Sequence, residues 1–492
     1  MKGSCRMHAC PGLSCPFTSF PRFLYPRATL IAAILATSAA RGAVAQSDEA
    51  VAGVGDAFDA AELIPAAASG LPPILSGQEP GARERGAVVP TPPPVDGARE
   101  WFGVSNWWTW TRATGDWGGA RAALDDTGMS FNGSAITEWS DVFSGASGPS
   151  GAFRFLVDLN LTFDLEKLLK LEGGSVFADF QTADTTSGGM FHGGFQPYSN
   201  IAIDGSITQL SQLWYEQWLF DRMLRLKLGK VDANTEFAYI PAAGGFINAS
   251  AGFSPAIFAL PTYPNPSTSV NVFVYPTESW YIGAGAYDGA ATIDGVQTGS
   301  RGPSTFFTDD LSDDWFFIAE TGLALSEVGP LKGMRVGLGG WWLSGEMPRF
   351  DGGTDDGTGG VYALAEARVW APEGTDLADD ECAQGLWAFG QYGWANDEVS
   401  LVSQQIGGGL SLSGTFAGRD EDSMGVYLSY VDFSDDPAAG LGASEFSIEV
   451  FYDFAVTPFL HIKPDLQWFL NPSGDASSDD ALVGTLRCTI NF

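Results

Sequence analysis

Charged and amide side chains alternate with apolar ones along many segments of this 492-residue chain. In the clearest segment, Phe153 to Leu165, the polar positions include Arg154, Asp158 and Asn160. A basic side chain costs about 2–4 kcal/mol at the centre of a bilayer, so a hydrated interior is the expected location for such residues. Along a narrow passage they can exchange hydrogen bonds with a solute and replace the water that it loses.

The same alternation predicts an inward-facing set, the pore-lining candidates. Trp214 and Trp218 share the parity of Glu216, and their planar rings can stack on the apolar face of a ring-shaped solute. Two other roles stay open, because charges can pair across strands and hold the sheet together, and tryptophans can lie at a membrane interface. The candidates are Arg154, Asp158, Asn160, Asp179, Trp214, Glu216, Trp218, Arg225, Lys227, Glu320, Glu366, Arg368, Glu449, Lys463 and Asp465.

Catalytic and metal chemistry find little support in the residue types. The histidines are His8, His192 and His461, and they form no metal-ligand spacing. Neither of the later two is accompanied by a Gly-x-Ser-x-Gly nucleophile turn, and no glycine loop for phosphate follows a strand and opens a helix. Acidic residues are so numerous that paired carboxylates indicate nothing specific. We therefore expect no catalytic residue, no cofactor and no metal site.

The elements that must position these side chains are strands. Sixteen segments carry a period-two pattern, an even number as a single-chain bacterial barrel requires, and a further short strand near 255–261 stays open. The regular face of the segments is almost purely Phe, Leu, Val and Ile, whereas a soluble sandwich would expose a polar face. We expect an all-β fold, a transmembrane antiparallel β-barrel of about 16 strands, over residues 129–492. The expected strands are 129–142, 153–165, 175–184, 208–219, 222–230, 267–276, 279–288, 315–326, 332–344, 360–371, 384–394, 400–414, 424–433, 446–454, 461–468 and 482–492.

The end of the chain supports the same architecture. From Leu482 to Phe492, apolar or small residues alternate with polar ones up to the last position. An open sheet edge in lipid would leave backbone groups without hydrogen bonds, so the last strand of a barrel has to pair. We expect the barrel-assembly machinery to recognise this strand, which ends in Phe492.

The front of the chain predicts export. Residues 1–45 carry basic residues but no acidic ones, and a short apolar run, Thr29 to Ala40, precedes the small-x-small pattern Ala43-Val44-Ala45. This pattern is typical of a cleavable signal peptide, and the run is too short to span a membrane. Residues 46–100 are rich in Ala, Pro and Gly, which predicts a flexible leader that buries no core.

The composition excludes two classes of protein. A net charge of −34 excludes a nucleic-acid binder, because neutralising phosphates needs an excess of Lys and Arg. After the export signal no run of 18 apolar residues occurs, which excludes a helical membrane protein. The acidic clusters predict solvated loops, and weak divalent-cation binding by them stays open. We expect no disulfide between Cys382, in an acidic loop, and Cys488, in the last strand.

Between the leader and the first strand, residues 101–128 form a tryptophan-rich segment. Asp116 is positioned to cap a short helix from Trp117 to about Asp126 that ends at Gly128 and has Trp117, Ala120 and Leu124 on its apolar side. We expect this helix at the periplasmic mouth, either narrowing the mouth or anchoring to the barrel surface. The motif residues are Gly115, Asp116, Trp117, Gly118, Gly119 and Arg121.

Four sequence blocks, spread over about residues 101–492, resemble the motifs of a known protein family. They are Thr114 to Leu124 with Gly128, Gln212 to Gln217 with Gly229 to Asp232, Tyr281 to Gly289, and Thr457 to Trp468 with Asn471 and Pro472. The chain resembles the carbohydrate-selective outer-membrane porins, the OprB-like family; the Gly-Asp-Trp-Gly-Gly-x-Arg and Pro-Asp-Leu-Gln elements are the specific ones. The resemblance implies a sixteen-stranded barrel through which sugars diffuse. The long leader and the acidic loops depart from the family pattern and leave the preferred sugar open.

We therefore expect a porin of a Gram-negative outer membrane that passes mono- and small oligosaccharides by passive diffusion, with no enzymatic activity. The expected partners are permeating sugars and outer-membrane lipid, and a homo-oligomer stays open. One alternative is a nonselective or cation-preferring diffusion porin. An outer-membrane hydrolase and a secreted soluble β-rich binding protein are less favoured alternatives.

Overall fold

The computed structural model describes residues 107–145, 151–185, 191–203, 205–288, 292–293, 296–297, 314–329, 331–372, 384–416 and 418–492. The predicted signal peptide, the predicted leader, the start of the tryptophan-rich segment and the loop that contains Cys382 lie outside the described residues. Within the described ranges, no helix is both long enough and apolar enough to cross a membrane.

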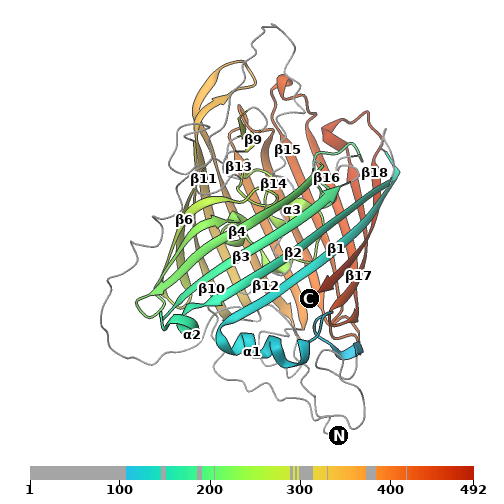
Figure 1. Cartoon of the computed structure of the whole chain (residues 1–492). Coiled ribbons are helices and arrows are strands. Elements are labelled where there is room, and N and C mark those ends of the chain that lie inside the picture. The colour runs from blue at the N-terminus through green and yellow to red at the C-terminus, as the bar shows by residue number, and fades with distance from the viewer. Residues whose placement is uncertain are drawn as a thin grey trace, which may run out of the picture.

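Sixteen antiparallel strands form a closed barrel, in which β1 pairs with β18 (Figure 1). This confirms the predicted fold class, and each predicted strand corresponds to one strand of the barrel. A separate ribbon joins β8 (Thr292–Ile293) and β9 (Val296–Gln297). The barrel strands are β1 (Met129–Ser144), β2 (Gly151–Asp164), β3 (Gly174–Thr185), β4 (Ser206–Leu219), β5 (Leu224–Val231), β6 (Ser267–Thr277), β7 (Trp280–Asp288), β10 (Trp315–Val328), β11 (Leu331–Pro348), β12 (Thr354–Trp370), β13 (Gly385–Ala395), β14 (Val402–Ser413), β15 (Ser423–Phe433), β16 (Ser444–Thr457), β17 (Leu460–Leu470) and β18 (Ala481–Asn491).

The two faces of the wall differ as the alternation predicts. Large apolar side chains such as Trp139, Leu338 and Ile406 are exposed on the outer face. Their neighbours along the strand point inward, and charged inward residues such as Glu138 and Arg154 are wholly buried. Successive strand side chains point to opposite faces, so an apolar outside and a polar inside follow directly from the sequence pattern.

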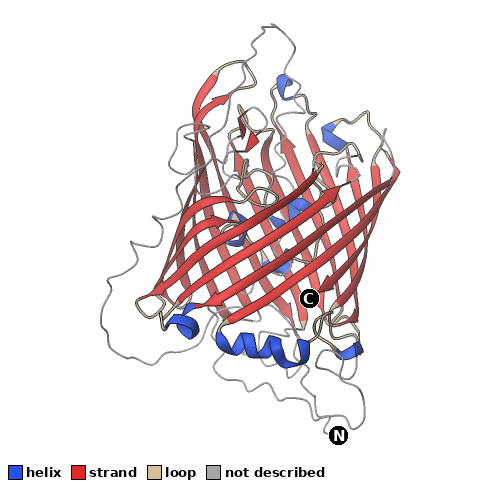
Figure 2. Ribbon diagram, viewed as in Figure 1, coloured by secondary structure: helices blue, strands red, loops and turns tan. Residues whose placement is uncertain are grey.

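Two loops fold into the barrel from the end opposite the helix α1. The first follows β3, and its described part, residues 191–203, is called the β3–β4 loop below; the second, residues 232–266, is called the β5–β6 loop. Figure 2 shows short helices of the second loop within the outline of the barrel. They are η5 (Ala233–Thr235), η6 (Pro241–Ala243) and α3 (Ala249–Gly252).

The strand that stayed open near 255–261 is absent, because these residues belong to the β5–β6 loop. Phe253, Ile257 and Leu260 are buried in a core cluster that the loop shares with the inner wall. Prolines at 255 and 261 remove two backbone donors, which disfavours ladder pairing. The apolar residues that suggested a strand therefore fill the interior instead of facing lipid.

The remaining helices are short and lie in connections. At the end where β1 begins, α1 (Ala120–Thr127) follows η4 (Trp117–Gly119) and runs beneath the strands, with α2 (Leu165–Leu169) beside it (Figure 1). Gly128 ends α1 at φ 99°, where a side chain would also collide with Lys167. The others are η3 (Trp107–Thr109), η10 (Pro437–Ala439) and η11 (Pro472–Gly474).

The predicted apolar side of this helix is only partly buried. Ala120 is exposed and Trp117 and Leu124 are half-buried, whereas the wholly buried residue of α1 is Arg121. The guanidinium lies 4.4 Å from the ring centroid of Trp117 and 5.5 Å from that of Phe131 on β1. Cation–π contacts let a charged residue take the buried position, which apolar periodicity alone does not reveal.

Candidate functional site

The β5–β6 loop packs on the inner wall through aromatic rings. Phe237 stacks on Phe273 of β6 with ring centroids 5.1 Å apart. Phe246 contacts Phe389 of β13 and Phe451 of β16 at 5.5 and 5.0 Å. The loop therefore touches the wall on well-separated strands, and its burial supplies the apolar stabilisation that an irregular segment needs to stay ordered.

Wall carboxylates fix the loop backbone. Glu320 on β10 accepts a hydrogen bond from the Ala238 N–H at 2.9 Å, and Glu366 on β12 accepts one from Ala242 N–H at 2.9 Å. Tyr281 also donates to Glu320, at 2.5 Å. Charge-assisted hydrogen bonds are stronger than neutral ones, so these predicted pore-lining residues position the loop.

Wall cations bind loop carbonyls on two sides of the interior. Lys463 on β17 donates to the Gly245 carbonyl at 2.7 Å and lies 3.3 Å from Asp453. Arg335 on β11 donates to the Tyr239 carbonyl. Its guanidinium also lies 2.9 Å from the Glu366 carboxylate.

Between these attachments the loop is partly exposed. Thr235, Glu236, Tyr239, Ala242 and Gly245 are half-buried, whereas residues 246–254 are buried. The segment 235–245 is therefore a part of the loop in which half-buried residues alternate with buried ones such as Phe237 and Ile240. We call it the passage segment.

A compensated charge cluster flanks the passage segment. Arg225 and Lys227 on β5 both form ion pairs with Glu236 of the loop. Lys227 also lies 3.3 Å from Glu216 on β4, and Arg225 lies 3.7 Å from the same carboxylate. Burial alone would raise the pKa of Glu236, but the two cations hold it below its usual value. The sequence prediction named three of these four residues and missed Glu236, which lies in no strand.

The two tryptophans differ in what covers their rings. Trp214 is buried, stacks on Phe177 at 4.9 Å and has the Lys227 ammonium 4.0 Å from its centroid. Trp218 is half-buried, donates to Glu216 at 2.8 Å and lies 5.4 Å from the ring of Tyr275. Stacking of either ring on a solute stays a prediction.

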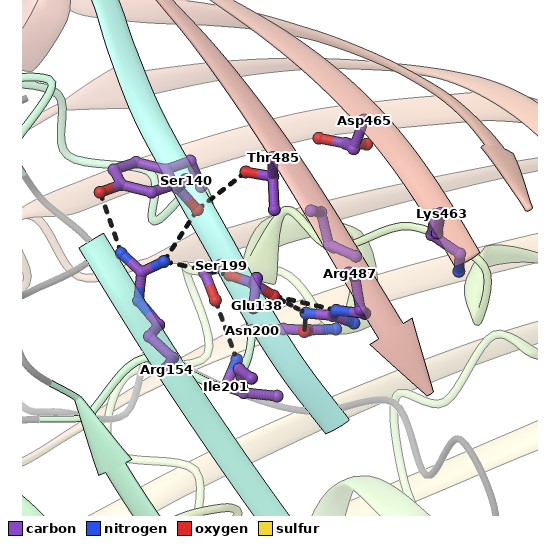
Figure 3. A network of polar contacts seen from close by, with 12 residues as sticks. Glu138, Ser140, Arg154, Ser199, Asn200, Ile201, Lys463, Asp465, Thr485 and Arg487 are labelled. Atoms are coloured by element: carbon purple, nitrogen blue, oxygen red, sulfur yellow. Dashed lines mark hydrogen bonds and ion pairs between the residues drawn. The ribbon is translucent and has the colours of Figure 1, made fainter. Parts of the chain in front are cut away.

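A second polar cluster bridges the closing strands of the barrel (Figure 3). Glu138 on β1 lies 3.1 Å from Arg154 on β2, and Arg487 on β18 donates to the other carboxylate oxygen at 2.6 and 2.9 Å. The β3–β4 loop covers the cluster, because Tyr198 accepts from Arg154 at 2.9 Å and Asn200 accepts from Arg487 at 2.6 Å. Arg154 was predicted; Glu138 and Arg487 were missed although both occupy inward positions of predicted strands.

The other predicted residues lie on the same inner face, away from the passage segment's ion pairs. Asp158 accepts from Gln181 at 2.8 Å, and Asn160 pairs with Asp179 across β2 and β3. Arg368 lies 5.5 Å from the ring of Trp387 on β13. Asp465 accepts from Gln467 at 3.0 Å, and Glu449 holds the β5–β6 loop. Contact with a permeating solute stays a prediction for every one of these residues.

The segment that contains the N-terminal motif is bonded to the last strand of the barrel. Asp116 accepts from the Ala122 N–H at 3.1 Å, so its side chain bonds into the first turn of α1, whose own N-cap is Gly119. The Ala113 N–H donates to the Asn491 carbonyl at 2.7 Å. The segment before α1 is thereby tied to the last strand.

Metal ligation has no geometric support in the part of the chain that the structure describes. No three His, Cys, Asp or Glu side chains converge there in a way that could hold an ion. The clusters described above join cations to carboxylates or carboxylates to backbone N–H groups. Their chemistry is hydrogen bonding and charge compensation.

Comparison with known proteins agrees with this geometry. At 22% identity the chain is similar to Porin B of Pseudomonas aeruginosa, over 77% of this chain and 90% of that protein. It is 24% identical to QuiX of Acinetobacter baylyi over 77% of this chain and 92% of that protein. A high-pH structure of Pseudomonas putida OprB superposes with a TM-score of 0.69 at 20% identity, covering 78% of this chain and 99% of that one.

The family model for the carbohydrate-selective porins, OprB family, matches residues 156–492. This range includes every barrel strand from within β2 to β18 and both inner loops. The chain belongs to the OprB family of carbohydrate-selective porins, which are proteins of the outer membrane.

Proposed function

We propose that this porin lets small neutral sugars cross the outer membrane by passive diffusion past the passage segment, residues 235–245. The supporting observation is charge compensation. Four wall cations that border the segment, Arg225, Lys227, Arg335 and Lys463, each lie within ion-pair distance of a carboxylate. Compensated charges present hydrogen-bonding groups to hydroxyls while exerting little net field on an ion.

A cation-preferring porin is the second candidate, because the chain carries a net charge of −34. Charges in exposed loops act from the entrance and are screened within about 8 Å at physiological ionic strength. When a solute passes the passage segment, the wall charges there are closer to it than the charges of the entrance loops are. For that reason we favour the neutral solute.

Two measurements on the reconstituted protein separate the candidates. Liposome swelling with a series of neutral sugars should show rates that fall with sugar size. The reversal potential in a KCl gradient should lie near zero. No swelling with any monosaccharide would defeat the sugar proposal, and a strongly cation-selective reversal potential would support the second candidate.

The remaining roles follow from the same proposal. Residues 1–45 act as a cleavable signal, 46–100 as a periplasmic leader, and 101–128 with α1 as a brace at the periplasmic mouth. The exposed aromatic and aliphatic belt contacts outer-membrane lipid, and the assembly machinery recognises β18 with Phe492. Transport needs no catalytic step, and the partly exposed residues of the passage segment contact the solute, held in place by the buried wall charges.

A further inference from the structure

Both inner loops attach to one strand of the wall. Glu445 and Glu449 lie on β16 with their side chains wholly buried on the inner face. The Glu445 carboxylate accepts from the N–H groups of Phe195 and Gln196 in the β3–β4 loop, at 2.7 and 2.9 Å. Two oxygens thus bind two successive backbone donors of one loop.

Glu449 does the same for the other loop. Its Oε1 accepts from the Ile247 N–H at 2.6 Å and its Oε2 from the Asn248 N–H at 3.0 Å. Both loops therefore present successive N–H groups to carboxylates that are four residues apart along β16. Because strand side chains alternate, the two glutamates share one face of the wall.

Gln467 on β17 lies directly across from Glu449 and holds both loops at once. Its Nε2 donates to the Tyr198 carbonyl of the β3–β4 loop at 2.9 Å. Its Oε1 accepts from Asn248 Nδ2 of the β5–β6 loop at 3.0 Å. One side-chain amide thereby bridges the two loops.

The loops also bond to each other. The Ala249 N–H donates to the Pro197 carbonyl at 3.1 Å. Asn200 Nδ2 donates to the Phe246 carbonyl at 3.3 Å. These contacts lie beside the residues that Glu445 and Glu449 hold, so displacing one loop removes partners of the other.

We propose that Glu445, Glu449 and Gln467 form an anchor station that holds the two inner loops as one body, so that the loops dock and undock together. All three are positioning residues. They hold the loop backbones in place and thereby set the width of the passage beside the loops. Both carboxylates need their N–H donors, because a buried charge without hydrogen bonds is strongly unfavourable. The inference concerns the protein alone and does not depend on which solute permeates.

The test reads each loop separately. In a background with every native cysteine replaced by serine, Ala202→Cys places a buried thiol in the β3–β4 loop and Ala251→Cys places one in the β5–β6 loop. The rate of reaction with a water-soluble maleimide reports undocking of the loop that carries the thiol. Both backbone N–H groups that Glu449 binds belong to the β5–β6 loop, and none belongs to the β3–β4 loop, yet we expect Glu449→Ala to speed labelling at position 202 by about tenfold. Glu445→Ala removes the bonds to Phe195 and Gln196 and one further bond, from the Ser473 N–H at 2.7 Å, but none to the β5–β6 loop. We expect it to speed labelling at position 251.

Thr485→Val is the matched control. Thr485 is also buried on the inner wall, and its hydroxyl bonds to Ser140 of the neighbouring strand at 2.9 Å. Both labelling rates should stay unchanged in this variant. If Glu449→Ala prevents folding, seen as loss of the heat-modifiable band on gels, Asn248→Ala is the second variant. It removes the side-chain bond to Gln467 and the N-cap bond from the Ser250 N–H, both at the β5–β6 loop, and should shift both rates in the same direction.

Two outcomes overturn the proposal. One is that each substitution speeds labelling only in the loop that it touches, because the loops then move independently. The other is that neither rate changes, because the station then does not hold the loops. Sugar permeation is measured separately in liposomes, so loss of transport cannot be confused with loss of coupling.

Discussion

Glu138 lies directly across from an arginine on each neighbouring strand, Arg154 on β2 and Arg487 on β18. Each of the three residues is at most 1% exposed. Removing charges from water costs several kcal/mol per ion, and the carboxylate between the two guanidinium groups compensates both of them. The pairing joins the first and last strands, where the barrel closes.

We predict that Glu138→Ala destabilises the folded barrel by about 3–5 kcal/mol, because it leaves two buried arginines without their shared partner. Guanidinium chloride unfolding in detergent micelles, followed by tryptophan fluorescence, measures the change. Replacing all three residues by methionine should restore most of the stability, since no unpaired charge then remains. A triple variant as unstable as the single one would show that the cluster acts through something other than charge compensation.

Individual side-chain roles could be predicted from the sequence only in part. Alternation placed Arg154 and Glu216 on the inner face, because side-chain direction in a strand has period two. It did not show that Arg154 binds Tyr198, a residue 44 positions away in a loop. Partners across a barrel depend on strand register and on how loops fold inward, and neither can be predicted from the local alternation of polar and apolar residues.

At the level of elements, the strands were predictable and the inner loops were not. Each strand repeats one local rule, whereas the β5–β6 loop is ordered by contacts with β6, β10, β12 and β16. The short strand that stayed open near 255–261 belongs to this loop, because short apolar runs fit either a strand or a buried loop. The 35 residues between β5 and β6 were the available signal, since so long a connection in a compact fold usually has a function.

His192 makes docking of the β3–β4 loop sensitive to acid. The ring is wholly buried against Phe469 at 4.1 Å and Tyr198 at 5.1 Å, and burial lowers its pKa from 6.5 to about 3. An undocked loop would therefore bind more protons between these two pH values than the docked loop does. Docking is fully stable above the ordinary pKa and weakens as the pH falls below it.

We predict that the thiol of Ala202→Cys reacts about tenfold faster at pH 5 than at pH 7.5, after correction for the intrinsic pH dependence of the maleimide reaction. Adding His192→Leu should remove most of this acid effect, because leucine fills the apolar site without titrating. The variant keeps Glu445, which lies near the same turn at Gly194. An unchanged acid effect in the leucine variant would assign the effect to Glu445 or another carboxylate.

At the scale of the whole molecule, the chain is strongly acidic while the wall that borders its passage is compensated. The net charge is −34, yet Arg225 and Lys227 on the wall are both paired with Glu236 of the passage segment. Ion selectivity depends on the charge near the narrowest point, because fields from distant loops are screened by salt. The molecule can therefore be very acidic and still discriminate weakly between ions.

We predict that Lys227→Met makes the porin cation-selective. The substitution leaves Glu216 and Glu236 to share a single cation, Arg225, so the passage gains one uncompensated negative charge. The reversal potential in a KCl gradient should move toward the potassium equilibrium potential, and the shift should shrink at high salt. Permeation of neutral sugars should change much less than the ion selectivity does.

Arg349→Met is the matched control, because it removes the same charge from the whole molecule. Arg349 lies beyond the end of β11 and pairs with Asp351 and Glu398, both of which are exposed. If selectivity follows local compensation, this variant keeps the reversal potential of the parent while Lys227→Met shifts it. Equal shifts in the two variants would mean that overall charge governs selectivity, and the cation-preferring alternative would then replace the proposed neutral passage.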